Sequence, residues 1–166
     1  MRFVEHAERL GIPMTWGTVR CAWEGMEGVP RLITVAEVQH FALQQVEGAS
    51  GDELTLVADL TSQDDHPEIS RELAEIAPEI LGREFRVCRL LYVRRALEEL
   101  PDEPIGGLME LTSLWGRMGY PEDAPHVVQG RGNNMVPAEY FTEENLRAVV
   151  DRHWTWVSSE LAFVRS

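Results

Sequence analysis

The sequence predicts an all-α fold, in which residues 1–166 form a single domain. Apolar residues recur at three- and four-residue spacing along most of the chain, which is the pattern of helices with one buried face. Three threonines that can cap a helix, Thr15, Thr34 and Thr142, stand just before such stretches. Short connections favour antiparallel neighbours, so the expected architecture is an antiparallel array of about seven helices.

The first part of the chain predicts a series of short helices. The best-defined start is at Thr34 and Glu37, which match a capping box because each side chain can satisfy the other's free backbone N–H. Pro67 favours another start, since proline is tolerated at the first helical position. Residues 52–61 fit an alternating strand and a helix equally well, and both alternatives stay open. The expected helices cover residues 3–10, 16–26, 35–46, 66–76 and 83–100.

The second part of the chain predicts two longer helices, over residues 105–118 and 143–164. Gly119 follows the first of them, and a glycine in the left-handed conformation commonly ends a helix. Thr142 can cap the second, whose apolar stripe includes His153. A histidine in such a stripe is expected to be a core residue with satisfied nitrogens rather than a catalytic base.

The chain is strongly acidic, with a formal net charge of −13, and its basic residues are all arginine. Nucleic acid is not expected as a direct partner, because phosphate binding needs a basic surface. Anionic membranes are disfavoured for the same reason, and no apolar run approaches the roughly 20 residues of a membrane span. A cationic protein would instead be attracted. The first residues carry no apolar leader segment, so a cytoplasmic location is expected.

Few side chains suggest chemistry. The histidines and cysteines show no metal-ligand spacing, and Cys21 and Cys88 are expected to be buried free thiols. We therefore predict no catalytic residue, no metal and no cofactor. The most site-like residue is His66, because a carboxylate from Asp64 or Asp65 could orient its imidazole for proton transfer. A helix start explains the same residues, since acidic side chains favour the positive end of the helix dipole.

The charge distribution is the most informative feature. Between Asp52 and Glu84 the chain carries ten acidic residues against two arginines, so about a fifth of the sequence holds most of the net charge. The stretch lacks the oxygen-ligand loop of a calcium site. It is either a solvated face or a docking surface for a basic partner. The residues predicted to form that docking surface are Asp59, Asp64, Asp65, Glu68, Glu72 and Glu75.

Four short motifs stand at helix caps, at turns and in the central helix: Thr15-Trp16-Gly17-Thr18-Val19, Ile33-Thr34-Val35-Ala36-Glu37-Val38, Arg89-Leu90-Leu91-Tyr92 and Gly119-Tyr120-Pro121-Glu122-Asp123. In their order along the chain, these motifs resemble a bacterial domain family of unknown function, some of whose members lie in toxin–immunity loci. The resemblance implies an all-α fold and an immunity role. It transfers no catalytic residue.

Three functional hypotheses follow from these observations. The first is a cytoplasmic immunity-type inhibitor, a non-catalytic protein that neutralises a cognate basic toxin domain through an acidic surface. The second is an enzyme or small-ligand domain with a dispersed site, around His66 or around Arg131 in the Gly130–Asn134 loop, although that loop lacks the lysine of a phosphate-binding loop. The third is a helical scaffold or adaptor.

Overall fold

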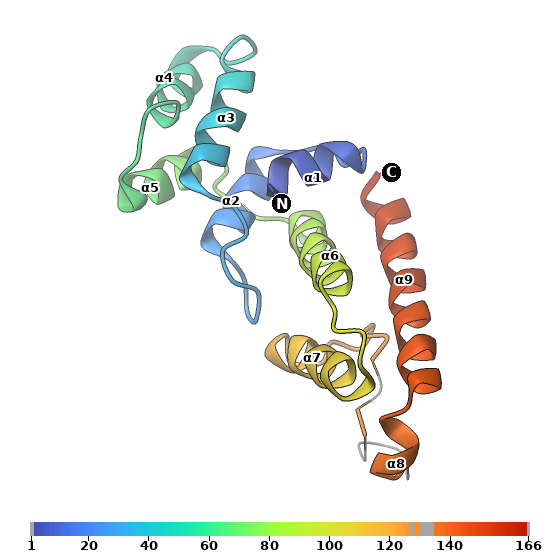
Figure 1. Cartoon of the computed structure of the whole chain (residues 1–166). Helices are drawn as coiled ribbons and strands as arrows, with labels where there is room; N and C mark the ends of the chain where they lie inside the picture. Colours follow the sequence, from blue (N-terminus) through green and yellow to red (C-terminus); the bar gives the residue numbers. More distant parts are fainter. Residues whose placement is uncertain (1, 127, 130–134, 166) are drawn as a thin grey trace. The chain divides into compact units, whose positions relative to one another are not determined.

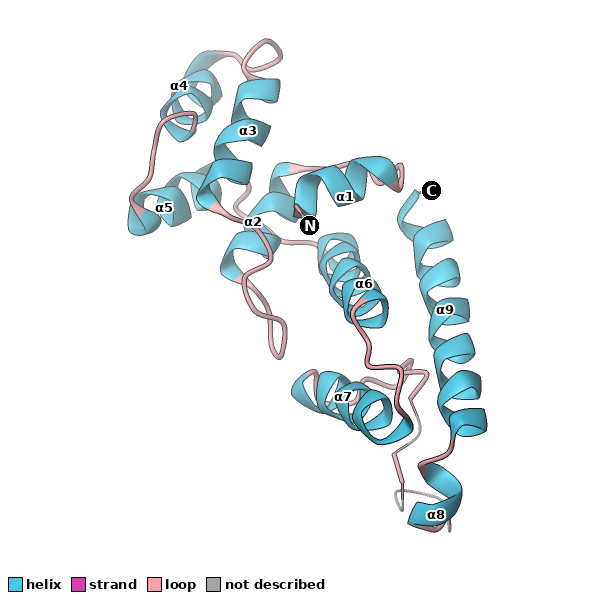
Figure 2. Ribbon diagram, viewed as in Figure 1, coloured by secondary structure: helices cyan, strands magenta, loops and turns pink. Residues whose placement is uncertain are grey.

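A computed structural model describes residues 2–126, 128–129 and 135–165. These residues form nine helices and no strand, which confirms the all-helical prediction for the described part of the chain (Figure 2). Their contacts divide into two compact units. The N-terminal unit contains residues 2–26, 30–91 and 165, and the C-terminal unit contains the other described residues. The single-domain, antiparallel arrangement stays a prediction.

The N-terminal unit contains five complete helices and the first part of a sixth (Figure 1). They are α1 (Phe3–Arg9), α2 (Trp16–Glu24), α3 (Val35–Gln45), α4 (Gly51–Leu60), α5 (His66–Ile76) and α6 (Gly82–Glu98). The ambiguous stretch 52–61 is helical as α4, which packs against α3 and α5. Its buried residues Val57 and Leu60 are three apart, so a helix turns both toward those neighbours.

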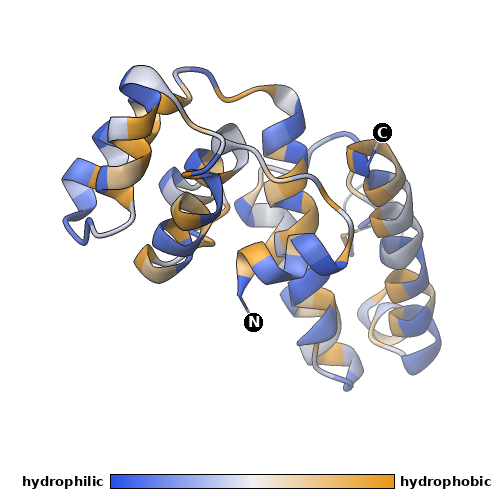
Figure 3. Cartoon of the chain, turned by 90° about the horizontal axis from the view of Figure 1, so that it is seen from above, coloured by the Kyte–Doolittle hydropathy of each residue, from blue (hydrophilic) through white to orange (hydrophobic). Residues whose placement is uncertain are grey.

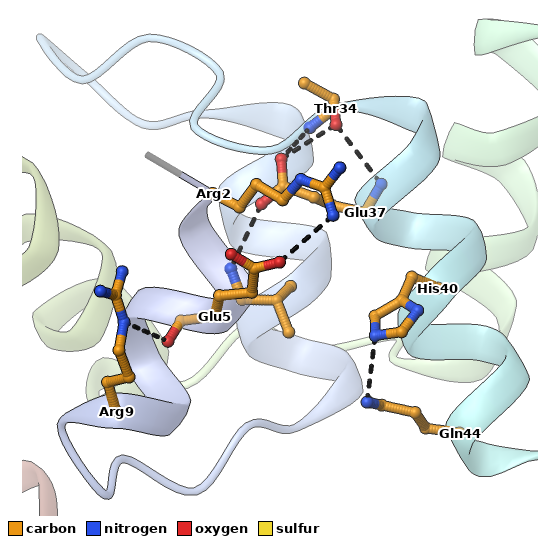
Figure 4. Close-up of polar contacts among 8 residues, drawn as sticks. Arg2, Glu5, Arg9, Thr34, Glu37, His40 and Gln44 are labelled. Atoms are coloured by element: carbon orange, nitrogen blue, oxygen red, sulfur yellow. Dashed lines mark hydrogen bonds and ion pairs between the residues drawn. The ribbon is translucent and has the colours of Figure 1, made fainter.

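Two of the predicted caps lie in this unit. Thr15 precedes α2, and its hydroxyl accepts a hydrogen bond from the Thr18 N–H at 3.1 Å. Thr34 and Glu37 form the complete capping box of α3. The same Glu37 carboxylate also reaches α1, where its Oε1 atom accepts a hydrogen bond from the Val4 N–H at 3.3 Å (Figure 4). One buried side chain therefore satisfies backbone donors at the starts of two helices.

The C-terminal unit is built around α7 (Pro104–Arg117) and α9 (Glu143–Arg165), with the one-turn helix α8 (Pro137–Tyr140) before α9. The predicted cap of α9 is confirmed, since Thr142 Oγ1 accepts a hydrogen bond from the Asn145 N–H at 3.2 Å. Helix α9 ends at the C-terminal label in Figure 3, where apolar and hydrophilic bands alternate around it. Its apolar band supplies core residues such as Val149, Val157 and Val164.

Helix α7 ends in a tight turn at Gly119, whose φ of 73° confirms the predicted left-handed conformation. The Tyr120 N–H donates to the Trp115 carbonyl at 2.9 Å, and the Gly119 N–H donates to the Gly116 carbonyl at 3.1 Å. These two bonds form a Schellman motif, which satisfies carbonyls that the helix end leaves free.

Replacing Gly119 with valine is expected to lower the free energy of unfolding by about 2 kcal/mol, because a β-branched residue is strained at positive φ. Chemical denaturation of wild type and Gly119→Val measures the difference. An unchanged denaturation midpoint would contradict the role given to this turn.

None of the helices in the described residues is both long enough and apolar enough to cross a membrane.

Candidate functional site

The six predicted docking residues lie at the end of α4, in the connection to α5, and along α5 itself. Asp59, Asp64, Asp65 and Glu75 are exposed, and Glu68 is partly exposed. We call these five residues the acidic surface. Glu72 differs from them, because only 4% of it is exposed.

Glu72 lies at the boundary between the acidic surface and the core. Burial raises the pKa of its carboxyl, the negative charge of Asp59 raises it further, and a hydrogen bond with Gln63 lowers it. Its Oε2 atom has no hydrogen-bond partner among the described residues. The sequence contained a signal for this burial, since Glu72 stands three residues after Ile69 and four before Ile76, within the apolar stripe of α5.

The negative charge of α4 and α5 is barely offset. Arg71 is the only arginine between positions 52 and 82, and this stretch contains no lysine. Its guanidinium pairs with Glu68, and it also lies 3.9 Å from the Glu75 carboxylate. Both pairs are solvent-exposed, and exposed ion pairs of this kind contribute about 0–1 kcal/mol to stability. The excess carboxylates therefore remain available to a cation from outside.

Of the two interpretations of His66, the structure contains the helix start, because α5 begins at this residue. Its Nδ1 atom lies 2.8 Å from Arg31 Nη1, and the imidazole must be the acceptor because a guanidinium only donates. Among the described residues, no hydrogen bond joins the imidazole to Asp64 or Asp65, whose backbone N–H groups bond to the Gln63 side chain. The carboxylate–imidazole pair of a general base is therefore not formed here.

Arg31 is held in place by an aromatic stack. Its guanidinium carbon lies 3.7 Å from the ring centroid of Trp23, and its Nε donates to the Trp23 carbonyl at 2.8 Å. The Trp23 indole N–H in turn donates to Ser70 Oγ on α5 at 2.9 Å. This cluster fixes the loop after α2 against the start of α5. No local pattern could reveal it, because the contact between Arg31 and His66 joins residues 35 positions apart.

The C-terminal unit contains a buried polar cluster around two histidines. His153 Nδ1 donates to the Val149 carbonyl at 2.7 Å, and its Nε2 accepts from the Trp115 indole N–H at 2.8 Å. Both nitrogens are thus satisfied in the neutral ring, which confirms His153 as a core histidine. Burial lowers its pKa, and the nearby Arg152 adds to this effect.

The second histidine, His126, is less well satisfied. The Thr112 hydroxyl donates to the Leu108 carbonyl, so its oxygen accepts from His126 Nε2 at 2.8 Å. The other ring nitrogen, Nδ1, is buried and has no partner among the described residues. A second proton would have to sit on that nitrogen. Burial lowers the pKa of His126 to about 4, and the charges of His153 and Arg152 contribute.

An open pocket of about 290 Å³ lies in the same unit, between the end of α6 and the first turns of α9. Its apolar lining includes Leu97 and Leu146, and its polar lining consists of Asp102, Glu143 and Arg147. Within the part of the chain that the structure describes, no three histidine, cysteine or acidic side chains converge as metal ligands. The loop 130–134, with Arg131, lies outside the described residues.

The sequence matches a known protein family over most of its length. The model of a family described as an uncharacterized protein conserved in bacteria (DUF2247) matches residues 5–161. The chain belongs to the DUF2247 family. No curated protein and no solved structure matches it. The match confirms the bacterial family of unknown function expected from the motifs, and it carries no information about toxin–immunity loci.

Three of the four motifs quoted for this DUF2247 chain have structural roles at helix ends. Thr15 caps α2, and its hydroxyl also donates to the buried Glu84 carboxylate at 3.3 Å. A Cβ atom on Gly17 would lie 3.1 Å from Glu84 Cγ, so a glycine leaves room for the carboxylate beside the start of α2. In the third helix, Thr34 and Glu37 form the capping box. Gly119 and Tyr120 end α7.

Proposed function

We propose that this protein is a non-catalytic, cytoplasmic binding protein of the immunity type, which neutralises a cognate basic toxin domain through the acidic surface of its N-terminal unit. The single-domain, antiparallel arrangement expected from the sequence is part of this proposal. No step of the proposed function requires a catalytic group. Inhibition results from occupying the partner's basic cleft and excluding its substrate.

The observation that carries the proposal is the uncompensated charge of α4 and α5. The five carboxylates of the acidic surface are exposed or partly exposed, and the single arginine of that stretch is already paired with two of them. A concentration of one charge sign steers an oppositely charged partner and raises its association rate. A nuclease or a translation-targeting toxin needs a basic cleft to hold phosphates, so such a cleft is the surface that this charge fits.

The geometry around His66 also favours binding over catalysis. Its imidazole is occupied by Arg31, and the two aspartates beside it in sequence do not orient it. The stacked Arg31 and Trp23 instead stiffen the start of α5. A rigid support for Asp64 and Asp65 lowers the ordering cost of binding.

Reversing two charges of the acidic surface tests the proposal. The double variant Asp64→Lys, Glu75→Lys should associate about tenfold more slowly with the proposed cognate basic toxin domain at about 0.01 M salt. The difference should shrink at 0.1 M salt, where the Debye length falls from about 30 Å to about 10 Å. Glu72 is left unchanged, because it is buried and its replacement would disturb folding. Stopped-flow association rates give the measurement.

A matched control separates the acidic surface from net charge. Glu122→Lys with Glu139→Lys makes the same change in total charge at exposed positions of the C-terminal unit. The control should retain most of the wild-type association rate. If both double variants associate equally slowly, only the net charge of the protein matters. If neither associates more slowly than wild type, the acidic surface is a solvated face and not a docking surface. Failure of co-expression to relieve growth inhibition by that toxin would contradict the immunity function itself.

A further inference from the structure

The pocket between the end of α6 and the first turns of α9 has an apolar floor and a charged rim. Leu97 and Leu146 line it and are buried, so they form its floor. Its charged lining residues, Asp102, Glu143 and Arg147, are exposed and stand at its rim. All of these residues belong to the C-terminal unit. The pocket therefore suits a ligand with one apolar part and one charged part.

Helix α7 fixes two of the residues that line this pocket. A Cβ atom on Gly107 would lie 2.8 Å from the Pro101 carbonyl oxygen and 2.9 Å from Leu146 Cδ1. The backbone of α7 therefore lies directly against the loop after α6 and against the floor residue from α9. Contacts this close restrict both lining residues. A pocket that is formed before its ligand arrives lowers the ordering cost of binding.

The charges of the rim are not neutralised by one another. Glu143 stands four residues before Arg147 on α9, a spacing and order that favour a helical ion pair. Within the described ranges of the chain, however, neither side chain takes part in a hydrogen bond or an ion pair, and the Asp102 carboxylate has no such partner either. One guanidinium is thus available to an anion, and two carboxylates are available to a cation.

We propose that this pocket binds a free α-amino acid with an apolar side chain. The ligand carboxylate pairs with Arg147, because a planar guanidinium matches a carboxylate with two parallel hydrogen bonds. The ligand ammonium pairs with Asp102 and Glu143, and the apolar side chain covers Leu97 and Leu146. Only a ligand with charges of both signs satisfies all three rim residues.

The size of the pocket agrees with this ligand class. Its volume of about 290 Å³ is at the lower end of the range of about 300–1,000 Å³ for small-molecule sites, so it suits a ligand smaller than a drug-sized molecule. The proposal is independent of the proposed inhibitory function, because the acidic surface belongs to the N-terminal unit and the pocket to the C-terminal unit.

Titration of the full chain with L-phenylalanine or L-leucine, followed by methyl NMR, tests the site. The methyl signals of Leu97, Leu146 and Val150 should shift saturably, while those of Val57 in the core of the N-terminal unit should stay unchanged. If neither amino acid causes a saturable shift at about 10 mM, or if the shifts lie only outside the pocket, the proposal is wrong.

Three analogues each remove one feature of the ligand. 3-Phenylpropionate lacks the ammonium, 2-phenylethylamine lacks the carboxylate, and glycine lacks the apolar side chain. Each should bind at least about tenfold more weakly than L-phenylalanine, because each leaves part of the rim or the floor without its partner. An analogue that binds as tightly as the amino acid would overturn the assigned ligand class.

Two exposed arginines of α9 provide a matched pair of variants. Arg147→Gln should weaken L-phenylalanine binding by about tenfold, since a charged hydrogen-bond donor to the carboxylate is lost. Arg152 does not line the pocket, so Arg152→Gln should retain the wild-type affinity. Both variants should fold, because exposed charges contribute little to stability. An equal loss of affinity in the two variants, or no loss in Arg147→Gln, would contradict the site.

Discussion

Replacing Gly28 with alanine is expected to lower the free energy of unfolding by about 3–5 kcal/mol, the sum of a backbone cost and an overpacking cost. Gly28 has a φ of 74°, a conformation that L side chains rarely adopt. A Cβ atom there would lie 2.0 Å from the Arg117 carbonyl oxygen and 2.6 Å from the Met118 nitrogen. Both obstacles are backbone atoms at the end of α7, which cannot rotate away as a side chain could.

Gly119→Ala is the matched control for this substitution. Gly119 has nearly the same φ, 73°, but a Cβ atom there would meet nothing within 4 Å. Its alanine variant should therefore show only the backbone cost of about 1–2 kcal/mol. Urea denaturation of both variants measures the difference, which reports the close approach of Gly28 to α7. Equal losses in the two variants would show that this approach does not stabilise the unit.

Lowering the pH from 6.5 to about 4 is expected to lower the free energy of unfolding by about 3 kcal/mol through the protonation of His126 alone. Its pKa is about 4 in the folded protein, against an ordinary value of 6.5. Between these pH values the unfolded chain binds a proton that the folded protein does not, so stability falls as pH falls from 6.5 to about 4. Above pH 6.5 the ring is neutral in both states, and it contributes no slope. The loss is about 1.4 kcal/mol for each pH unit within the window.

A variant comparison isolates this contribution from other titrating groups. His126→Gln keeps a donor for Thr112 and cannot take up a proton, so its stability should lack the slope between pH 6.5 and 4. Subtracting the free energies of unfolding of the two proteins at each pH also removes the contribution of Glu72, which both share. The raised pKa of Glu72 has the opposite effect, because it stabilises the folded state as pH falls. Parallel pH dependences in wild type and variant would exclude His126 as the acid-sensitive group.

Elements that are set by residues close together in the chain are predictable from the sequence. The capping box at Thr34 and Glu37 and the turn at Gly119 depend on neighbours within five positions, so a local pattern specifies them. The helix expected over residues 3–10 is α1, and that over 66–76 is α5. These elements required no knowledge of the tertiary fold.

The remaining differences arise from tertiary contacts. Residues 52–61 were ambiguous because their apolar pattern fits both a strand and a helix. They form a helix that packs against α3 and α5. Helix α8 has only four residues, too few for a periodic pattern. His66 lies at the helix start that the sequence offered, but its contact with Arg31 was not predicted, and Glu72 was expected on the docking surface and is buried. The partner of His66 is distant in sequence, whereas the burial of Glu72 follows from its place in the apolar stripe of α5.

The double use of Glu37 has a consequence for the order in which this part of the chain folds. Helix α1 has seven residues, far fewer than the roughly 12–15 that an isolated helix needs in water. One of its first-turn amides is satisfied by a carboxylate that is correctly placed only when α3 has begun. Helix α1 therefore depends on a residue synthesised after it. We therefore expect α1 and the start of α3 to form, and to open, together.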